Sequence, residues 1–136
     1  MTGCVTLLLV DDDPITRKIL ASMIGKKYPQ ITIFFAENGL EALDMVDLHH
    51  PDLMILDLGM IHMGGFEVLH QLTLRNQIMQ ILVMSAYDME DVTELLYSIS
   101  HQPDLEFIKK PVEKDVFFQL IDRLLTRIDS AVCVDK

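Results

Sequence analysis

The sequence is poor in cysteine and has no long hydrophobic run. Its two cysteines among 136 residues, Cys4 and Cys133, lie near the termini and form no CxxC or other metal-ligand spacing. This excludes a disulfide framework and a cysteine metal site, so we expect two ordinary thiols in a reducing compartment. No apolar run approaches the roughly 20 residues of a membrane helix, and the N-terminus lacks the basic and apolar regions of a signal peptide. We therefore expect a cytoplasmic protein without membrane contact.

Basic residues are also few, because 11 lysines and arginines stand against 21 aspartates and glutamates and leave a net charge of −10. Nucleic-acid binding relies on clustered positive charge, so we expect no direct nucleic-acid binding by this domain. Apolar residues make up 50% of the chain, enough for the core of a single domain. We expect that domain to span residues 1–129, with residues 130–136 as a C-terminal tail or the start of a linker.

Short apolar runs alternate with helical patterns along the whole chain. The runs are typical of buried β-strands and cover residues 5–10, 31–36, 53–56, 78–85 and 105–109. Helical periodicity follows each run, in residues 14–27, 40–49, 66–76, 89–99 and 112–128. This alternation predicts an α/β fold with a parallel sheet that helices cover on both faces. Right-handed crossovers leave few topologies, and we expect the doubly wound, flavodoxin-like strand order 2-1-3-4-5.

Apolar stripes predict which side of each helix faces the sheet. The first helix begins with Asp13 at its N-cap and Pro14 at its first position, a common pairing at helix starts. The expected stripes of the first, fourth and last helices are Ile15, Ile19, Met23 and Ile24; Met89, Val92, Leu95, Leu96 and Ile99; and Val112, Val116, Leu120, Leu124 and Ile128.

Polar residues gather where the predicted strands end. Asp11 and Asp12 follow the first strand, and Asp57 follows the third. Ser85 ends the fourth strand, and Lys110 follows the fifth. In an open parallel sheet, sites form outside these carboxyl ends near the switch in strand order, so we expect the side chains to lie together. The crowded carboxylates would repel one another, and Mg²⁺ would relieve the repulsion, with the carbonyl of Gly59 as a further oxygen ligand. Asp57 is then suited to accept a phosphoryl group as a carboxylate nucleophile.

Four motifs resemble those of the receiver domain of bacterial two-component response regulators. They are Leu9-Val10-Asp11-Asp12, Leu56-Asp57, Ser85-Ala86 and Lys110-Pro111, and they extend the resemblance over roughly residues 5–128. The resemblance implies a phosphorylation-dependent switch whose partners are a sensor histidine kinase or phosphotransfer protein and a downstream effector domain or protein. It also implies output through the face formed by about residues 87–100, 105–109 and 112–128.

The resemblance gives the acidic residues distinct roles. Asp57 is implied to be the phosphorylation site, which takes its phosphoryl group from a phosphohistidine. Asp12 is implied to bind Mg²⁺ directly, Asp11 largely through water and Gly59 through its carbonyl. Such a domain is a signalling phosphoacceptor that assists its own phosphorylation and dephosphorylation, and it is not counted as an enzyme.

Three further roles follow from the same resemblance. Ser85 is implied to be the switch hydroxyl that moves onto the phosphate, and Lys110 the lysine that pairs with it. Lys110 is expected to precede a cis peptide bond at Pro111, and Phe107 occupies the position of the switch aromatic residue. Taken alone, Phe107 is equally well interpreted as an ordinary core aromatic.

The sequence departs from the family pattern near the site. Ile61 stands where proline is common, and Gly64 stands where an acidic or amide residue usually precedes Gly65. Phe107 lacks the hydroxyl of the more usual tyrosine, and Tyr87 is bulky enough to shield a phosphate from water. We expect a looser loop after Asp57 with altered partner contacts.

Two other functions remain open on the sequence. A pseudo-receiver would act as a docking module without phosphorylation, and the altered loop after Asp57 is consistent with this hypothesis. A phosphatase of the haloacid-dehalogenase type would use Asp11 and Asp13, but its motif wants Thr or Val where Ile15 stands, and the chain is short for that fold. Asp57 together with Lys110-Pro111 is the feature that favours the receiver.

Overall fold

A computed structural model describes residues 5–60, 63–77, 79–87 and 105–131. The strands are β1 (Thr6–Val10), β2 (Thr32–Ala36), β3 (Leu53–Asp57), β4 (Gln80–Ser85) and β5 (Glu106–Lys109). All neighbouring strands pair in parallel, in the order β2-β1-β3-β4-β5. The predicted flavodoxin-like sheet is therefore confirmed.

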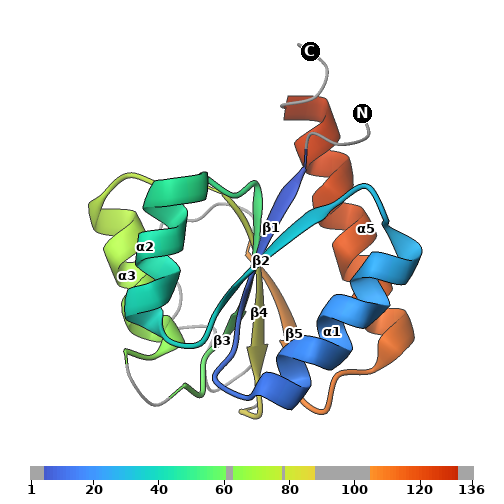
Figure 1. The fold of residues 1–136 in the computed structure, drawn as a ribbon, viewed down its shortest axis with the longest axis horizontal. Helices are drawn as coiled ribbons and strands as arrows, with labels where there is room; N and C mark the ends of the chain where they lie inside the picture. Colours follow the sequence, from blue (N-terminus) through green and yellow to red (C-terminus); the bar gives the residue numbers. More distant parts are fainter. Residues whose placement is uncertain (1–4, 61–62, 78, 88–104, 132–136) are drawn as a thin grey trace.

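Helices cover both faces of this sheet. They are α1 (Pro14–Lys27), α2 (Gly39–His49), α3 (Gly65–Leu74) and α5 (Lys114–Ala131). Figure 1 shows α1 and α5 on one face and α2 and α3 on the other. None of the described helices has the length and apolar character to cross a membrane. The expected helix at residues 89–99 lies outside the described residues, as do Cys4 and Cys133.

The sheet separates two hydrophobic layers. Leu7, Leu9 and Ile55 point to the α1 and α5 side, and Leu8 and Met54 point to the α2 and α3 side. Successive residues of a strand face opposite sides, which accounts for this division. Every residue of β3 is buried, as expected for a strand covered on both faces. β3 thus runs through the middle of the core and places Asp57 at its end, at the edge of the sheet.

Two of the predicted apolar stripes are wrong in part. In α1, Ile24 is buried, but the exposed fractions of Ile15 and Ile19 are 68% and 54%. In α5, Val116 is exposed and its neighbour Phe117 is fully buried. A spacing of four residues overshoots the helical turn of 3.6 residues, so the end of such a stripe rotates away from the sheet.

Side-chain caps set the helix starts. The Asp13 carboxylate accepts a hydrogen bond from the N–H of Ile15 at 3.0 Å, as predicted for the N-cap of α1. The last helix begins at Lys114 rather than at residue 112, and the carboxylate of Glu113 accepts the N–H groups of Asp115 and Val116. It continues to Ala131, past the expected end at residue 128.

Candidate functional site

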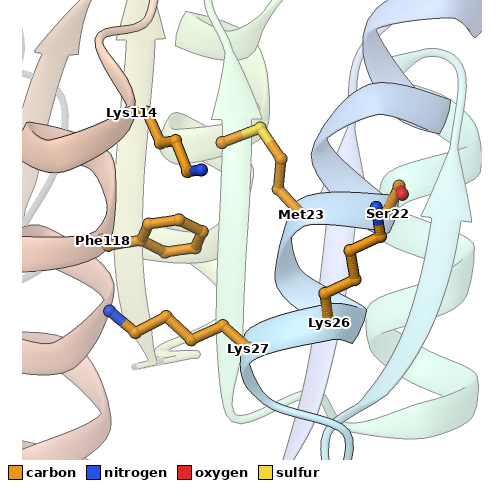
Figure 2. A pocket seen from close by; sticks show the side chains of 6 residues that line it. All are labelled: Ser22, Met23, Lys26, Lys27, Lys114 and Phe118. Carbon is orange, nitrogen blue, oxygen red and sulfur yellow. The ribbon is translucent and has the colours of Figure 1, made fainter.

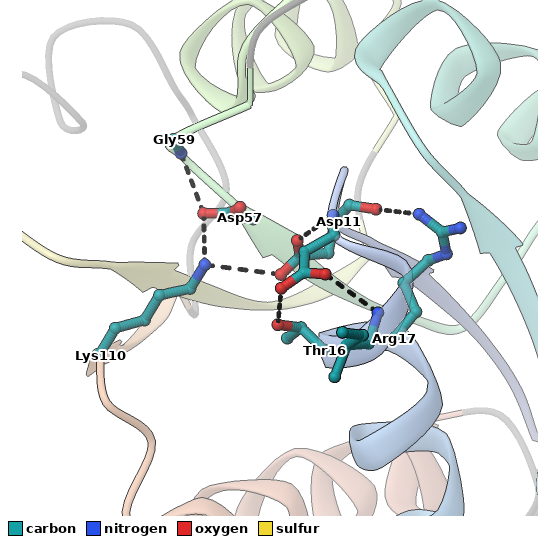
Figure 3. A network of polar contacts seen from close by, with 8 residues as sticks. Asp11, Thr16, Arg17, Asp57, Gly59 and Lys110 are labelled. Carbon is teal, nitrogen blue, oxygen red and sulfur yellow. Dashed lines mark hydrogen bonds and ion pairs between the residues drawn. The ribbon is translucent and has the colours of Figure 1, made fainter.

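Three carboxylates from two strand ends meet at one edge of the sheet. Figure 3 shows two of them, Asp11 and Asp57. Asp11 and Asp12 follow β1, and Asp57 is the last residue of β3, which pairs directly with β1. Their oxygen atoms lie within 4.8 Å of one another. The cluster lies at the topological switch point, because β1 connects to β2 on one side and pairs with β3 on the other.

Lys110 joins this cluster from the end of β5. Its Nζ atom lies 3.1 Å from Oδ1 of Asp57 and 3.5 Å from Oδ2 of Asp11. The lysine side chain is 29% exposed, whereas those of Asp11 and Asp57 are 1% and 5% exposed. Its backbone N–H donates to the carbonyl of Ser85 at 2.8 Å, and the expected cis bond to Pro111 is present. The ammonium group therefore bridges two buried carboxylates.

Burial and charge act together on the pKa values of this cluster. Burial raises the pKa of Asp11 above its ordinary value, and the nearby charge of Asp57 raises it further, against the hydrogen bond from Asp13 and the charge of Lys110. Burial lowers the pKa of Lys110, but the hydrogen bond and charge of Asp57, followed by those of Asp11, outweigh it and raise that pKa. Lys110 is thus held in its charged form beside Asp57 and Asp11.

The donor set fits a hard divalent cation. The site offers carboxylate oxygens from Asp11, Asp12 and Asp57, and Asp12 is the most exposed of the three. Mg²⁺ prefers oxygen ligands and retains several waters, which suits a site that opens to solvent at Asp12. Lys110 alone leaves the cluster with excess negative charge, which such a cation would balance.

The loop between β1 and α1 is fixed by a network of hydrogen bonds (Figure 3). The N–H of Asp13 donates to Oδ1 of Asp11 at 2.9 Å, and the Thr16 hydroxyl donates to Oδ2 of Asp13 at 2.9 Å. The hydrogen bond from Thr16, followed by the one from the N–H of Ile15, lowers the pKa of the Asp13 carboxyl. Arg17 donates from its guanidinium to the backbone carbonyl of Asp11 at 2.6 Å. The sequence pattern did not predict this contact, because the position of Arg17 off the apolar stripe of α1 was its only signal.

The loop after β3 holds Asp57 from the other side. The N–H of Gly59 donates to Oδ1 of Asp57 at 2.9 Å, so the same oxygen faces both this amide and Lys110. Gly65, the first residue of α3, packs against the backbone of the strand end: a Cβ there would lie 2.7 Å from the Asp57 carbonyl oxygen and 2.9 Å from Cα of Leu58. A side chain at residue 65 would therefore push α3 away from Asp57.

We expect the Gly65→Ala variant to lose about 1–3 kcal/mol of unfolding free energy, because the added methyl overpacks against backbone that cannot yield. Urea titration measures the loss. Gly25→Ala is the matched control, since no atom lies within 4 Å of a Cβ at that position of α1. Alanine in a helix is favoured over glycine by roughly 0.5–1 kcal/mol, so the control gains stability. Equal gains in both variants would contradict the close packing of Gly65.

Of the remaining predicted residues, Ser85 lies in β4 and Phe107 in β5. Ser85 ends β4 and is buried, and its hydroxyl oxygen accepts the N–H of Tyr87 at 2.9 Å. Tyr87 itself is 61% exposed. Phe107, in β5, is half-buried and packs against the layer on the α2 and α3 side. Ile61 lies outside the described residues.

Comparison with known proteins gives the same family from sequence and structure. Residues 7–122 match the model of the response regulator receiver domain. Sporulation initiation phosphotransferase F of Bacillus subtilis is 33% identical over 79% of this chain and 90% of that protein. The response regulator TrrA of Thermotoga maritima, solved in complex with Mg²⁺-BeF, is 27% identical with a TM-score of 0.74, over 88% of this chain and 98% of that one.

Other relatives are longer than this chain. An uncharacterized response regulatory protein of Staphylococcus epidermidis is 31% identical over 90% of this chain but only 47% of its own length. The chain thus spans about half the length of the first curated relatives that it matches. The receiver model, in contrast, matches most of the chain. The chain belongs to the response regulator receiver domain family, whose members are signalling phosphoacceptors of two-component systems rather than classical enzymes.

Proposed function

We propose that this chain accepts a phosphoryl group on Asp57 from a phosphohistidine of a sensor kinase or phosphotransfer protein. One observation carries the proposal: the Asp57 carboxylate is buried beside two other carboxylates, and the Lys110 ammonium lies 3.1 Å from its Oδ1. A buried carboxylate at a strand end is costly unless it is paired. The arrangement places the Asp57 carboxylate beside a cationic partner at the edge of the sheet.

In the proposed step, an oxygen of Asp57 forms a bond to phosphorus while the bond between phosphorus and the donor imidazole nitrogen breaks. The imidazole nitrogen takes up a proton as it leaves. The Lys110 ammonium and the Gly59 N–H already face Oδ1 of Asp57 and are near enough to orient the carboxylate for attack. Mg²⁺ held by Asp11, Asp12 and Asp57, with the Gly59 carbonyl as a further ligand, would offset the negative charge that gathers on the phosphoryl oxygens.

The same residues support a self-assisted switch. After transfer, Lys110 would pair with the phosphoryl group, and the Ser85 hydroxyl would leave the N–H of Tyr87 to donate to a phosphoryl oxygen. Because the chain itself supplies these groups, it would assist both its phosphorylation and its dephosphorylation. A response of Phe107 to this movement of Ser85 is part of the proposal, since the two residues occupy the neighbouring strands β4 and β5.

The proposed output passes to a downstream effector domain or protein. We assign it to the face formed by residues 87–100, β5 and α5, of which residues 88–100 lie outside the described ranges. We also propose residues 1–129 as the receiver domain and residues 130–136 as a C-terminal tail or the start of a linker. The charge of −10 favours a protein partner over direct nucleic-acid binding by this domain, and the two-cysteine composition favours the cytoplasm.

The exposed side of α1 is the surface that we propose for the phosphodonor. Ile15 and Ile19 are exposed there, and Ile19 lies in a shallow groove shared with Lys110 and Pro111. The groove between α1 and α5 continues the surface with three lysines and no acidic residue; it is lined by Ser22, Met23, Lys26, Lys27, Lys114 and Phe118 (Figure 2). An apolar centre with a charged rim is the usual composition of a protein interface.

We expect Ile19→Glu to slow phosphoryl transfer from a phosphorylated sensor kinase by about tenfold or more, as loss of a central apolar contact does at interfaces. Transfer from acetyl phosphate should stay at the parent rate, because that donor needs no docking surface. Leu48→Glu is the matched control, since Leu48 is 70% exposed on α2, on the opposite face of the sheet. Equal rates of kinase transfer for both variants would remove α1 from the docking surface.

The experiment that tests the proposed function is the intact mass of the protein after incubation with acetyl phosphate. We expect one added phosphoryl group per chain in the presence of Mg²⁺ and none in EDTA. No adduct on the folded protein, together with no response to beryllofluoride, would favour the docking module. Turnover of a generic phosphoester such as p-nitrophenyl phosphate would favour the phosphatase.

A further inference from the structure

We propose that Arg17 is a positioning residue that holds the peptide between Asp11 and Asp12, so that the Asp12 carboxylate faces the metal. The inference rests on the proposed Mg²⁺ site. Its starting point is the hydrogen bond of 2.6 Å from a guanidinium nitrogen of Arg17 to the backbone carbonyl of Asp11, six residues earlier in the chain (Figure 3).

The carbonyl of Asp11 needs such a donor. β1 ends at Val10, so this carbonyl is the first beyond the strand. The N–H of Asp11 still pairs with the carbonyl of Ala36 at 3.1 Å, at the end of the neighbouring strand β2. Asp11 is fully buried, and a buried backbone acceptor is costly without a partner. Arg17 supplies it with a charge-assisted hydrogen bond, which is stronger than a neutral one.

Asp12 depends on this contact more than its two neighbours do. Asp11 is held by the Asp13 N–H and by Lys110, and Asp57 is held by the Gly59 N–H and by Lys110. In the described ranges, no donor contacts the Asp12 carboxylate, although it belongs to the acidic cluster. Its direction therefore follows from the backbone that carries it. That backbone includes the peptide plane whose oxygen Arg17 holds.

Arg17 is itself anchored well enough for this role. Its own N–H donates to the carbonyl of Asp13 at 3.1 Å within the first turn of α1, and the residue is half-buried. The side chain thus runs back from a rigid helix to the loop that precedes it. Arg17 thus holds both ends of residues 11–13, Asp13 through its backbone N–H and Asp11 through its guanidinium, which fixes the loop before any cation binds.

Placement and charge have opposite consequences for Mg²⁺, which makes the inference testable. A guanidinium that acted only as a charge would repel the cation, so its removal would tighten Mg²⁺ binding. A guanidinium that places Asp12 has the contrary effect, and its loss weakens binding. Arg17→Gln removes the charge and Arg17→Lys keeps it, and both lose the contact with the Asp11 carbonyl in its present geometry.

The experiment is calorimetric titration of Mg²⁺ into the parent, Arg17→Gln, Arg17→Lys and Lys18→Gln, each below its unfolding temperature. We expect the dissociation constant for Mg²⁺ to rise about tenfold in both Arg17 variants, the size of effect seen when a residue that orients a metal ligand is lost. Lys18 is exposed on the same helix, and Lys18→Gln should match the parent. At saturating Mg²⁺, the Arg17 variants should be phosphorylated at close to the parent rate.

A double-mutant cycle separates positioning from general weakening of the fold. In an Asp12→Asn background, adding Arg17→Gln should change Mg²⁺ affinity little, because the ligand that it places is already altered. Equal or tighter binding by Arg17→Gln, or additive losses in the double variant, would overturn the inference. Failure of the parent to bind Mg²⁺ at all would instead refute the proposed metal site itself.

Discussion

The Asp57→Asn variant is expected to take up no phosphoryl group from acetyl phosphate under conditions that phosphorylate the parent. Asparagine has nearly the same shape and retains an oxygen for the Gly59 N–H, which donates to Oδ1 of Asp57 at 2.9 Å. It lacks the carboxylate that forms the bond to phosphorus. The variant should therefore fold and lose only the chemistry. Intact mass spectrometry measures the uptake, and urea titration measures the fold.

The matched control for this variant is Asp52→Asn, at the other end of β3. Asp52 precedes β3 and accepts the backbone N–H of Thr6 at 2.9 Å, far along the strand from the acidic cluster. We expect this variant to be phosphorylated like the parent. A persistent adduct in Asp57→Asn would mean that another group accepts the phosphoryl group, and loss of the adduct in Asp52→Asn would point to an indirect effect of the fold.

The second large effect is expected for Lys110→Met. Methionine keeps the bulk of the side chain and removes the ammonium group that lies 3.1 Å from Asp57 and 3.5 Å from Asp11. Loss of one preorganised charge partner in a transition state costs about 100-fold or more in rate. We expect a loss of that size in the rate of phosphorylation by acetyl phosphate, measured by the time course of the intact mass.

The same substitution should also lower stability, because it leaves two buried carboxylates without their counter-charge. We expect a loss of about 1–3 kcal/mol in EDTA, as for an unpaired buried group, and a partial recovery in Mg²⁺. Lys114→Met serves as control, since Lys114 is exposed at the start of α5. If Lys110→Met and Lys114→Met had equal phosphorylation rates, the ammonium of Lys110 would have no part in the transfer.

The sequence predicted the sheet and the residues at its edge for a physical reason. Parallel strands that are buried on both faces have continuous apolar sequences. Each apolar run here is followed directly by a polar residue, as the run 53–56 is by Asp57. The alternation with helices then fixes the direction of every strand, so that the polar ends of β1 and β3 must share one edge. Neither step needs knowledge of side-chain contacts.

The parts that could not be predicted depend on three-dimensional contacts that no periodicity records. The bond from Arg17 to the Asp11 carbonyl joins a side chain to a backbone atom, and only the path of the loop brings them together. The close approach of Gly65 to the end of β3 depends on the docking of α3. The exposure of Ile15 and Ile19 could not be predicted, because an apolar residue has the same sequence pattern whether it packs in the core or lies on the surface.

The most direct test of the central claim is to locate the phosphoryl group on the chain. Borohydride reduces an aspartyl phosphate to homoserine, so reduction after phosphorylation, followed by peptide mass spectrometry, marks the modified residue. We predict homoserine at position 57, only in the sample that contained Mg²⁺, with aspartate intact at positions 11 and 12. Homoserine at a different aspartate, or none in a protein that had gained a phosphoryl group, would contradict Asp57 as the phosphoacceptor.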